Sequence, residues 1–149
     1  MQYSKTQKGP IQYLLYGVVA VLLPLAWLNR QEPAGVVAIA CVAVAMILAG
    51  LAFGYMTVRD EGDRLAIRYG PLPIFRRRIP YAAITALEPG RSAIIDGWGI
   101  HYIPFRGWTY NLWGFGCAKL CLGKRVIRVG SDDVENLVGF LRGKIQEAG

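Results

Sequence analysis

IQYLLYGVVAVLLPLAWLNRQEPAGVVAIACVAVAMILAGLAFGYM, residues 11–56, contains two long apolar runs separated by a short polar turn. The first run, residues 11–28, has 18 residues without a charge, and the second, residues 35–56, has 22. At 1.5 Å per residue these runs correspond to helices of about 27 and 33 Å, close to the hydrocarbon thickness of a bilayer. The sequence therefore predicts two transmembrane helices.

The short link between the runs, residues 29–34, forces the two predicted helices into an antiparallel hairpin. A cleaved signal peptide is the competing interpretation of the first run. That run is long for the apolar region of a signal peptide, and a second apolar run follows at once, so we favour the hairpin.

Basic residues flank the hairpin on the side of its two chain ends. Lys5 and Lys8 precede the first run and several arginines follow the second, whereas in the connecting turn Arg30 is offset by Glu32. The positive-inside rule then predicts that both termini are cytoplasmic. Neither run contains an ionisable Asp, Glu, Lys, Arg or His, so nothing in them suggests an ion path or transport site. The hairpin is expected to be an anchor.

The second run carries small residues at four-residue spacing, ending in Gly50 and Gly54, a G-x-x-x-G pattern. Small residues let two helix backbones approach closely in lipid. One interpretation is that this seam receives the first helix of the same chain. The other is that Gly50 and Gly54 face another subunit, either a partner or a second copy in a homo-oligomer.

From Val58 onward the pattern changes to short alternating segments, as in residues 64–69, where Leu65, Ile67 and Tyr69 alternate with other residues. Gly123-Lys124 separates the last two segments in the manner of a β-hairpin. A terminal amphipathic helix follows, capped by Ser131 or Asp132. The expected strands cover residues 57–60, 64–69, 75–80, 83–88, a segment near Ile94, and residues 100–102, 109–111, 119–122 and 125–129. The apolar stripe of the helix consists of Val134, Leu137, Val138, Leu141 and Ile145.

Short strands followed by one amphipathic helix are the element order of a pleckstrin-homology-like (PH-like) barrel, which is expected to use about seven of these segments as its strands. The sequence resembles the bacterial PH-like membrane proteins in an ordered set of segments. These segments are D-E-G-D-R-L at 60–65, R-R-R-I-P-Y-A-A-I at 76–84, G-W-G-I at 97–100, Y-N at 110–111 and I-R-V-G-S-D-D-V-E-N-L at 127–137. The resemblance implies an N-terminal segment and hairpin over residues 1–57, and a cytoplasmic PH-like barrel over 58–149, closed by the C-terminal helix. It also implies location in the bacterial inner membrane and carries no shared catalytic residues.

The sequence offers little material for catalysis or metal binding. His101 is the only histidine, and a C-x-x-x-C such as Cys117 and Cys121 is poor metal geometry without further ligands. The glycines match neither a P-loop nor a dinucleotide fingerprint. We therefore expect no enzyme activity, no cofactor and no metal site.

Basic residues suggest one binding surface. The net charge is +7, and from Val58 onward 14 Lys and Arg stand against 9 Asp and Glu. Anionic phospholipid headgroups are the simplest partner for a basic domain beside a membrane, and a nucleic acid is not expected. Strand alternation puts Arg76 and Arg78 on one face and Arg77 on the other. The candidate headgroup contacts are Arg59, Arg68, Arg76 and Arg78, unless these form only a solvated sheet face.

Aromatic residues between 98 and 115 suggest a second surface. Part of this cluster is expected to fill the barrel, but Phe105-Arg106-Gly107-Trp108 is typical of an exposed turn. Exposed Trp and Arg are enriched at protein-binding hot spots. The candidate partner contacts are Phe105, Arg106, Trp108 and Trp113.

Together these features predict a non-enzymatic, membrane-anchored adaptor. Its expected role is an accessory, assembly or scaffold subunit that binds another integral membrane protein or complex. The alternative is a module that senses anionic lipid headgroups through its arginines.

Overall fold

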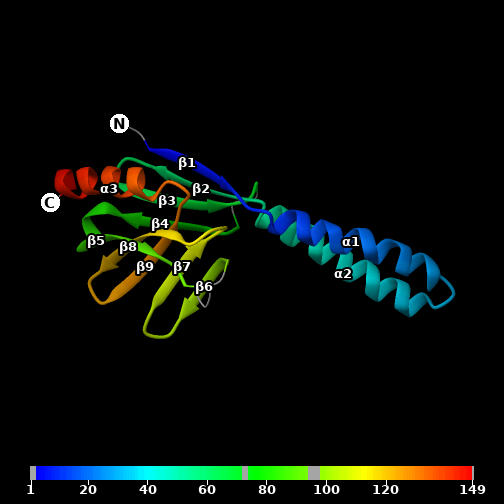
Figure 1. Ribbon diagram of the computed structural model, residues 1–149. Coiled ribbons are helices and arrows are strands. Elements are labelled where there is room, and N and C mark those ends of the chain that lie inside the picture. The colour runs from blue at the N-terminus through cyan, green and yellow to red at the C-terminus, as the bar shows by residue number, and fades with distance from the viewer. Residues whose placement is uncertain (1–2, 72–73, 94–97, 149) are drawn as a thin grey trace.

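The computed structural model describes residues 3–71, 74–93 and 98–148. Two long helices extend from one end of a body made of two sheets and a third helix (Figure 1). Both chain ends lie at the opposite end of that body, far from the turn that joins the two helices (Figure 1). The body is therefore attached to the helices at one pole.

The helices α1 (Ile11–Leu28) and α2 (Pro33–Ala52) form the expected antiparallel hairpin. Both are long and apolar enough to cross a membrane, and their side chains are largely uncovered. Helix α1 has the predicted bounds. Helix α2 begins two residues early because Pro33 suits the first helical turn, and it ends at Ala52 because Tyr55 already belongs to a strand.

Strand β1 (Ser4–Lys8) precedes α1 and pairs antiparallel with β2 (Tyr55–Asp60), which follows α2. The sequence did not predict β1. Its residues, SKTQK, lack apolar alternation, so the strand depends on pairing with β2. The strand pair thus continues directly into the helix pair (Figure 1).

The first sheet has the order β1-β2-β3-β4, with β3 at Arg64–Tyr69 and β4 at Arg76–Pro80. Residues 61–63, which lie between two of the expected strands, join β2 to β3, and all neighbouring strands of this sheet are antiparallel. Met56, Ile67 and Ile79 lie on the buried face. The opposite face carries most of the arginines.

The second sheet follows a short 3-10 turn, η1 (Tyr81–Ala83), and has the order β5-β8-β9-β7-β6. The predicted β-hairpin across Gly123-Lys124 is confirmed, whereas β7 and β9 pair in parallel. The strand expected near Ile94 lies outside the described residues. The strands are β5 (Ala86–Arg91), β6 (Gly99–Ile103), β7 (Gly107–Asn111), β8 (Gly116–Leu122) and β9 (Arg125–Gly130).

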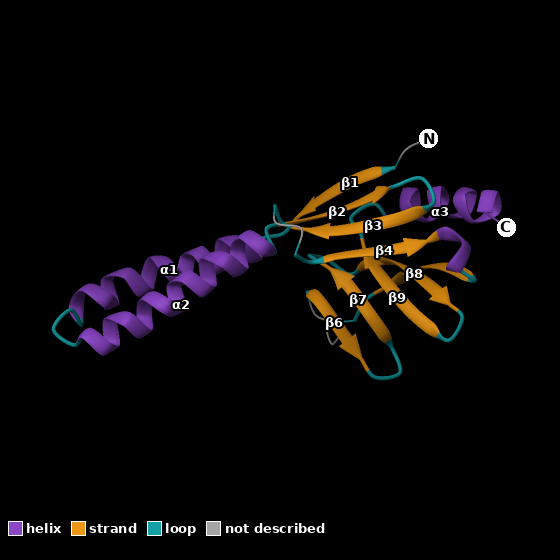
Figure 2. Cartoon of the chain, turned by 180° about the vertical axis from the view of Figure 1, so that it is seen from behind, coloured by secondary structure: helices purple, strands orange, loops and turns teal. Residues whose placement is uncertain are grey.

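The prediction of a closed barrel was wrong. Among the described residues no strand pairing joins the two sheets, which form separate layers (Figure 2). The edge strands explain why. Strand β4 presents three exposed arginines, and β5 contains Pro89, which lacks a backbone N–H. Charge and proline at edge strands both oppose further pairing.

The core lies between the sheets and under helix α3 (Val134–Ala148). Leu137, Val138 and Leu141 of the predicted stripe are buried, so the expected helix face is confirmed. The helix begins slightly later than expected. The Asp133 carbonyl accepts the first helical hydrogen bond from the Leu137 N–H, while the Ser131 hydroxyl accepts one from the Asp133 N–H.

Candidate functional site

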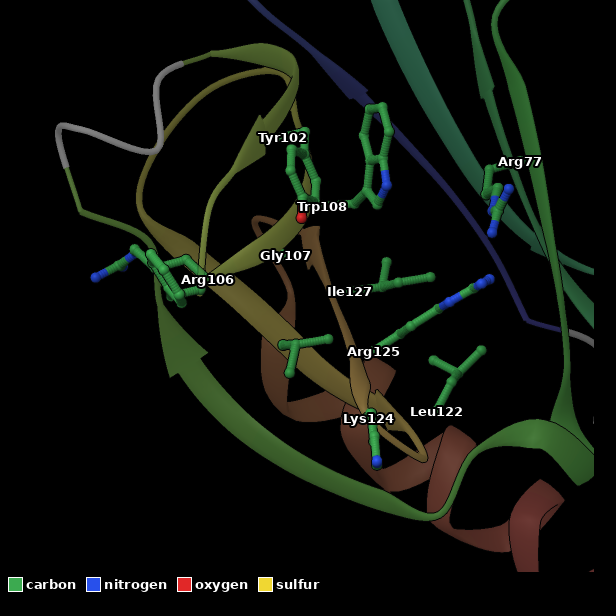
Figure 3. Close-up of a pocket in the computed structure, with 11 residues that line it drawn as sticks. Arg77, Tyr102, Arg106, Gly107, Trp108, Leu122, Lys124, Arg125 and Ile127 are labelled. Carbon is green, nitrogen blue, oxygen red and sulfur yellow. The ribbon is translucent and has the colours of Figure 1, made fainter.

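A cavity of about 670 Å³ opens where the two sheets diverge. Its walls come from the β6–β7 hairpin, the β8–β9 hairpin and the edge strand β4 (Figure 3). The absence of barrel closure therefore leaves an open space lined by both sheets.

One wall of the cavity is an uncovered continuation of the core face of the second sheet. Tyr102 pairs with Trp108, and Trp108 pairs with Ile127, in one row across β6, β7 and β9. The Tyr102 and Trp108 rings lie 5.3 Å apart. Ile127 is buried, whereas Trp108 is 42% and Tyr102 59% exposed. The row thus passes from the core into solvent and presents aromatic surface to the cavity.

The cavity is basic. Arg77, Arg106, Lys124 and Arg125 line it, and none of the described lining residues is acidic. Arg125 points across the cavity toward Arg77, whereas Arg106 and Lys124 point away (Figure 3). Within the described part of the chain, no carboxylate pairs with Arg77 or Arg125. Two guanidinium groups of like charge that face each other favour an anionic occupant.

Arg77 reaches this position because it lies on the same side of β4 as the buried Ile79 and pairs with Ile67, although its own side chain is exposed. This agrees with the predicted alternation of Arg76, Arg77 and Arg78. Its charge also acts on Tyr110 at the edge of the core. Burial raises the pKa of Tyr110, and the nearby Arg77 opposes that rise. Tyr110 is therefore a neutral hydroxyl beside a cationic cavity.

The β6–β7 turn carries an exposed and strained phenylalanine. Phe105 has φ of 65° and is fully exposed, at 107% of its reference area. A bulky residue with positive φ is an outlier that costs local backbone energy. Nearby, a Cβ on Gly107 would lie 2.1 Å from the Val126 carbonyl oxygen, so glycine is required for β7 to approach β9.

The structure brings together three of the four residues predicted to bind a partner. Phe105, Arg106 and Trp108 border the cavity. Trp113 does not lie there, because it follows β7 and sits at the base of the α1–α2 helical hairpin, where the sheets meet the two helices. Its ring lies 4.3 Å from that of Trp98, and its carbonyl accepts a hydrogen bond of 2.7 Å from Gln7 Nε2.

Three of the four arginines predicted to contact headgroups, Arg59, Arg68 and Arg78, converge on Glu61. Arg59 Nη2 and Arg68 Nη2 each lie 2.9 Å from Glu61 Oε1, and Arg78 Nε lies 2.9 Å from Oε2. The hydrogen bond from Arg59, followed by the charges of Arg78, Arg59 and Arg68, lowers the pKa of Glu61. Arg76 stands outside this cluster and is exposed.

Gly50 and Gly54 face α1 of the same chain. A Cβ on Gly50 would lie 2.5 Å from Tyr16 Cε1, and one on Gly54 would lie 2.4 Å from Gln12 Oε1. These contacts correspond to the first of the two interpretations of the G-x-x-x-G pattern. The two glycines therefore allow close packing of α1 against the end of α2 within the helical hairpin.

Sequence reasoning missed Arg125, Lys124 and Tyr102 as members of the cavity. The sequence assigns Lys124 and Arg125 only to a β-hairpin, and it leaves Tyr102 in the aromatic cluster between 98 and 115, part of which is expected to fill the barrel. The available signal was the placement of Arg77 on the core side of its strand, which is unusual for an arginine.

Other candidate chemistry is dispersed. His101 is exposed on β6, Cys117 is buried and Cys121 is partly buried. Among the described residues, no group of His, Cys, Asp or Glu is arranged to hold a metal ion.

No model of a known protein family matches the sequence, and a search of curated proteins finds no significantly similar relative.

Proposed function

We propose that this chain is a non-enzymatic, membrane-anchored adaptor that binds an acidic segment of another integral membrane protein. The single observation that carries this proposal is the cavity between the sheets. It combines exposed aromatic surface, from Tyr102 and Trp108, with Arg77 and Arg125, and no described lining residue supplies a counter-charge. Aromatic and arginine side chains of this kind dominate protein-binding hot spots.

An extended segment with acidic side chains and an apolar anchor fits this chemistry best. Its carboxylates would neutralise Arg77 and Arg125, and Arg–carboxylate pairs are strong when they are bidentate. Its apolar side chain would cover Trp108. Phe105 would pack on the outer side of the same segment, which gives a reason for its complete exposure.

The helical hairpin supplies the membrane anchor in this proposal. Helices α1 and α2 have the length and composition of spans, and basic residues flank the ends that join the sheets. We place those ends in the bacterial cytoplasm by the positive-inside rule. The two sheets and the closing α3 then form a PH-like cytoplasmic domain in an open variant, and the role is that of an accessory, assembly or scaffold subunit.

Headgroup sensing through Arg59, Arg68, Arg76 and Arg78, on the outer face of the first sheet, has weaker support. Arg59, Arg68 and Arg78 are engaged with Glu61, so they have a partner before any lipid arrives. Arg76 favours the alternative because it forms no ion pair in the described part of the chain. One such side chain near a surface contributes about 1 kcal/mol, too little for a sensor.

The test is capture of partners by the tagged full-length protein in a mild detergent, with the eluate sized and identified by mass spectrometry. We expect a stoichiometric membrane protein that is lost with Trp108→Ala and with Arg125→Ala. The matched control is Arg142→Ala, which removes an exposed arginine on α3, away from the cavity. A partner that all three variants retain, or a protein that carries only lipid, would contradict the proposal.

A further inference from the structure

We infer that the apolar rim at the base of the hairpin docks the domain onto the lipid headgroup region of the bilayer. This base rim consists of Ile74, Phe75, Trp98 and Trp113. The inference shares the membrane anchor with the proposed function but is independent of the cavity. It assigns the domain a second surface, whose partner is lipid.

The β3–β4 side of the rim is fixed to the end of α2. Phe53 directly follows α2, and its ring stacks on Phe75 at 5.4 Å and meets Tyr69 edge-on at 5.7 Å. Ile74 precedes Phe75 and is 67% exposed. Ile74 and Phe75 therefore present apolar side chains at the level where α2 ends.

The tryptophan side of the rim is fixed to the start of α1. Trp98 and Trp113 contact each other at 4.3 Å. Trp113 is tied to Gln7 by a hydrogen bond, and a Cβ on Gly9 would touch Leu112 at 3.0 Å. A Cβ on Gly99, the residue next to Trp98, would lie 3.8 Å from Cε1 of Phe53. Both rings thus lie beside the two points at which the chain enters and leaves the hairpin.

The rim lies at the depth of a membrane interface if the hairpin spans the bilayer. Helices α1 and α2 have 18 and 20 residues, or about 27 and 30 Å at 1.5 Å per residue. That length matches the hydrocarbon core, so the helix ends and the rim beside them fall among the headgroups. Tryptophan is enriched at this depth because its ring is apolar and its N–H is polar.

Two cations border the rim. Lys8 is exposed at the end of β1, and Arg76 directly follows Phe75. Neither forms an ion pair within the described residues. Cations beside an apolar rim suit the phosphates of anionic lipids. Lipid thus covers the apolar atoms and neutralises the charges at one surface.

This docking orients the cavity. The β6–β7 turn with Phe105 lies at the other end of its strands from Trp98 and Trp113 (Figures 1 and 2). With the rim on the bilayer and the strands β1 and β2 continuous with the helices, the domain cannot swing freely. The cavity is then held to the side of the hairpin, where a neighbouring membrane protein can reach it.

The chain contains a matched control for the test. Trp98, Trp113 and Trp108 are 43%, 41% and 42% exposed, but Trp108 belongs to the cavity and the others to the rim. Three proteins are made that each retain one of these tryptophans, with the remaining tryptophans replaced by Phe to preserve ring packing. A fourth protein retains Trp27, at the far end of α1. All are reconstituted in phosphatidylcholine–phosphatidylglycerol vesicles.

Lipids brominated near the headgroup end of the acyl chain should quench Trp98 and Trp113 strongly, and iodide in the water should quench them several-fold less than Trp108. Trp108 should be quenched strongly by iodide and only weakly by the brominated lipids. If Trp98 and Trp113 respond as Trp108 does while bromolipid quenches Trp27, the rim is not docked and only this inference fails. If Trp27 also escapes bromolipid, both the anchor and the docking are wrong.

A second readout avoids the tryptophan replacements. In a protein whose three native free cysteines are replaced by alanine, Ile74→Cys places a single thiol on the rim, and Phe105→Cys places one at the exposed turn of the cavity. In the same vesicles, a charged maleimide should modify the rim thiol several-fold more slowly than the turn thiol. Equal rates would overturn the docking.

Discussion

Lys8 and Tyr55 lie opposite each other in the antiparallel pair of β1 and β2, although the whole helical hairpin separates them in the sequence. The hairpin is therefore an insertion between two paired strands, and each helix continues into a strand. Such a connection transmits position from the helices to the sheet without a flexible linker.

The first prediction concerns that strand pair. The Tyr3 carbonyl accepts a hydrogen bond from the Asp60 N–H, so the alternation of an antiparallel ladder also points the Lys5 N–H toward Val58. Lys5→Pro removes this donor, and we expect a loss of roughly 1–3 kcal/mol in the free energy of unfolding. Lys5→Ala, which removes only the exposed ion pairs with Asp132 and Asp133, should cost much less. Thermal unfolding in detergent gives the comparison, and equal losses would exclude β1 as a structural strand.

The second prediction concerns the packing of the hairpin. A side chain at Gly50 collides with the Tyr16 ring, so Gly50→Leu should destabilise the helix pair by roughly 1–3 kcal/mol. Gly17→Leu is the control, because a Cβ there meets nothing within 4 Å. The thermal midpoint in detergent is the measurement. If both variants match the wild type, α1 and α2 do not pack through Gly50.

The third prediction concerns pH. The arginines around Glu61 hold its pKa below the ordinary value of 4.5, so the ionised form stabilises the fold. This contribution is complete above that ordinary value and is lost as the pH falls through the lower pKa of the folded state. Glu61→Gln should therefore be less stable than the wild type at pH 7, and the difference should shrink under acid. Thermal midpoints from pH 7 downward test this, and a pH-independent difference would argue against the arginine cluster.

Local patterns were enough to predict the elements that depend on local physics. The apolar runs gave α1 and α2, the apolar stripe gave α3, and alternation gave β3, because each signal lies within one segment. Strand β1 and the separation of the two sheets depend instead on pairings between distant segments. A polar five-residue edge strand and the choice of two sheets over a barrel leave little trace in sequence.

The site was only partly predictable for a similar reason. The exposed turn at Phe105 was visible from its residues, whereas the cavity needs Arg77 from one sheet and Arg125 from the other. Trp113 was grouped with Trp108 because the two are close in the sequence. A strand separates five positions by about 16 Å, which places the two rings at different ends of β7.

The fourth prediction concerns Phe105. Its φ of 65° is unfavourable for a phenylalanine and acceptable for asparagine, and its side chain makes no buried contact. Phe105→Asn should therefore leave the free energy of unfolding unchanged or raise it by no more than about 1 kcal/mol, which the thermal midpoint reports. The same variant should weaken capture of the partner. A clear loss of stability would mean that Phe105 serves the fold, and unchanged capture would remove it from the binding surface.

The fifth prediction follows from the two facing guanidinium groups. Without a ligand, Arg77 and Arg125 repel each other, so Arg125→Gln should leave the isolated protein as stable as the wild type or up to about 1 kcal/mol more stable. The same change removes one of the two charges proposed to hold the acidic segment, and capture of the partner should fall. Arg59→Gln is the contrasting variant, because Arg59 hydrogen-bonds to Glu61 and its loss should lower stability while capture persists. Opposite effects on stability and binding would identify the cavity as a surface kept for recognition. If Arg125→Gln lowers stability as Arg59→Gln does, Arg125 has a structural role and the acidic segment must bind elsewhere.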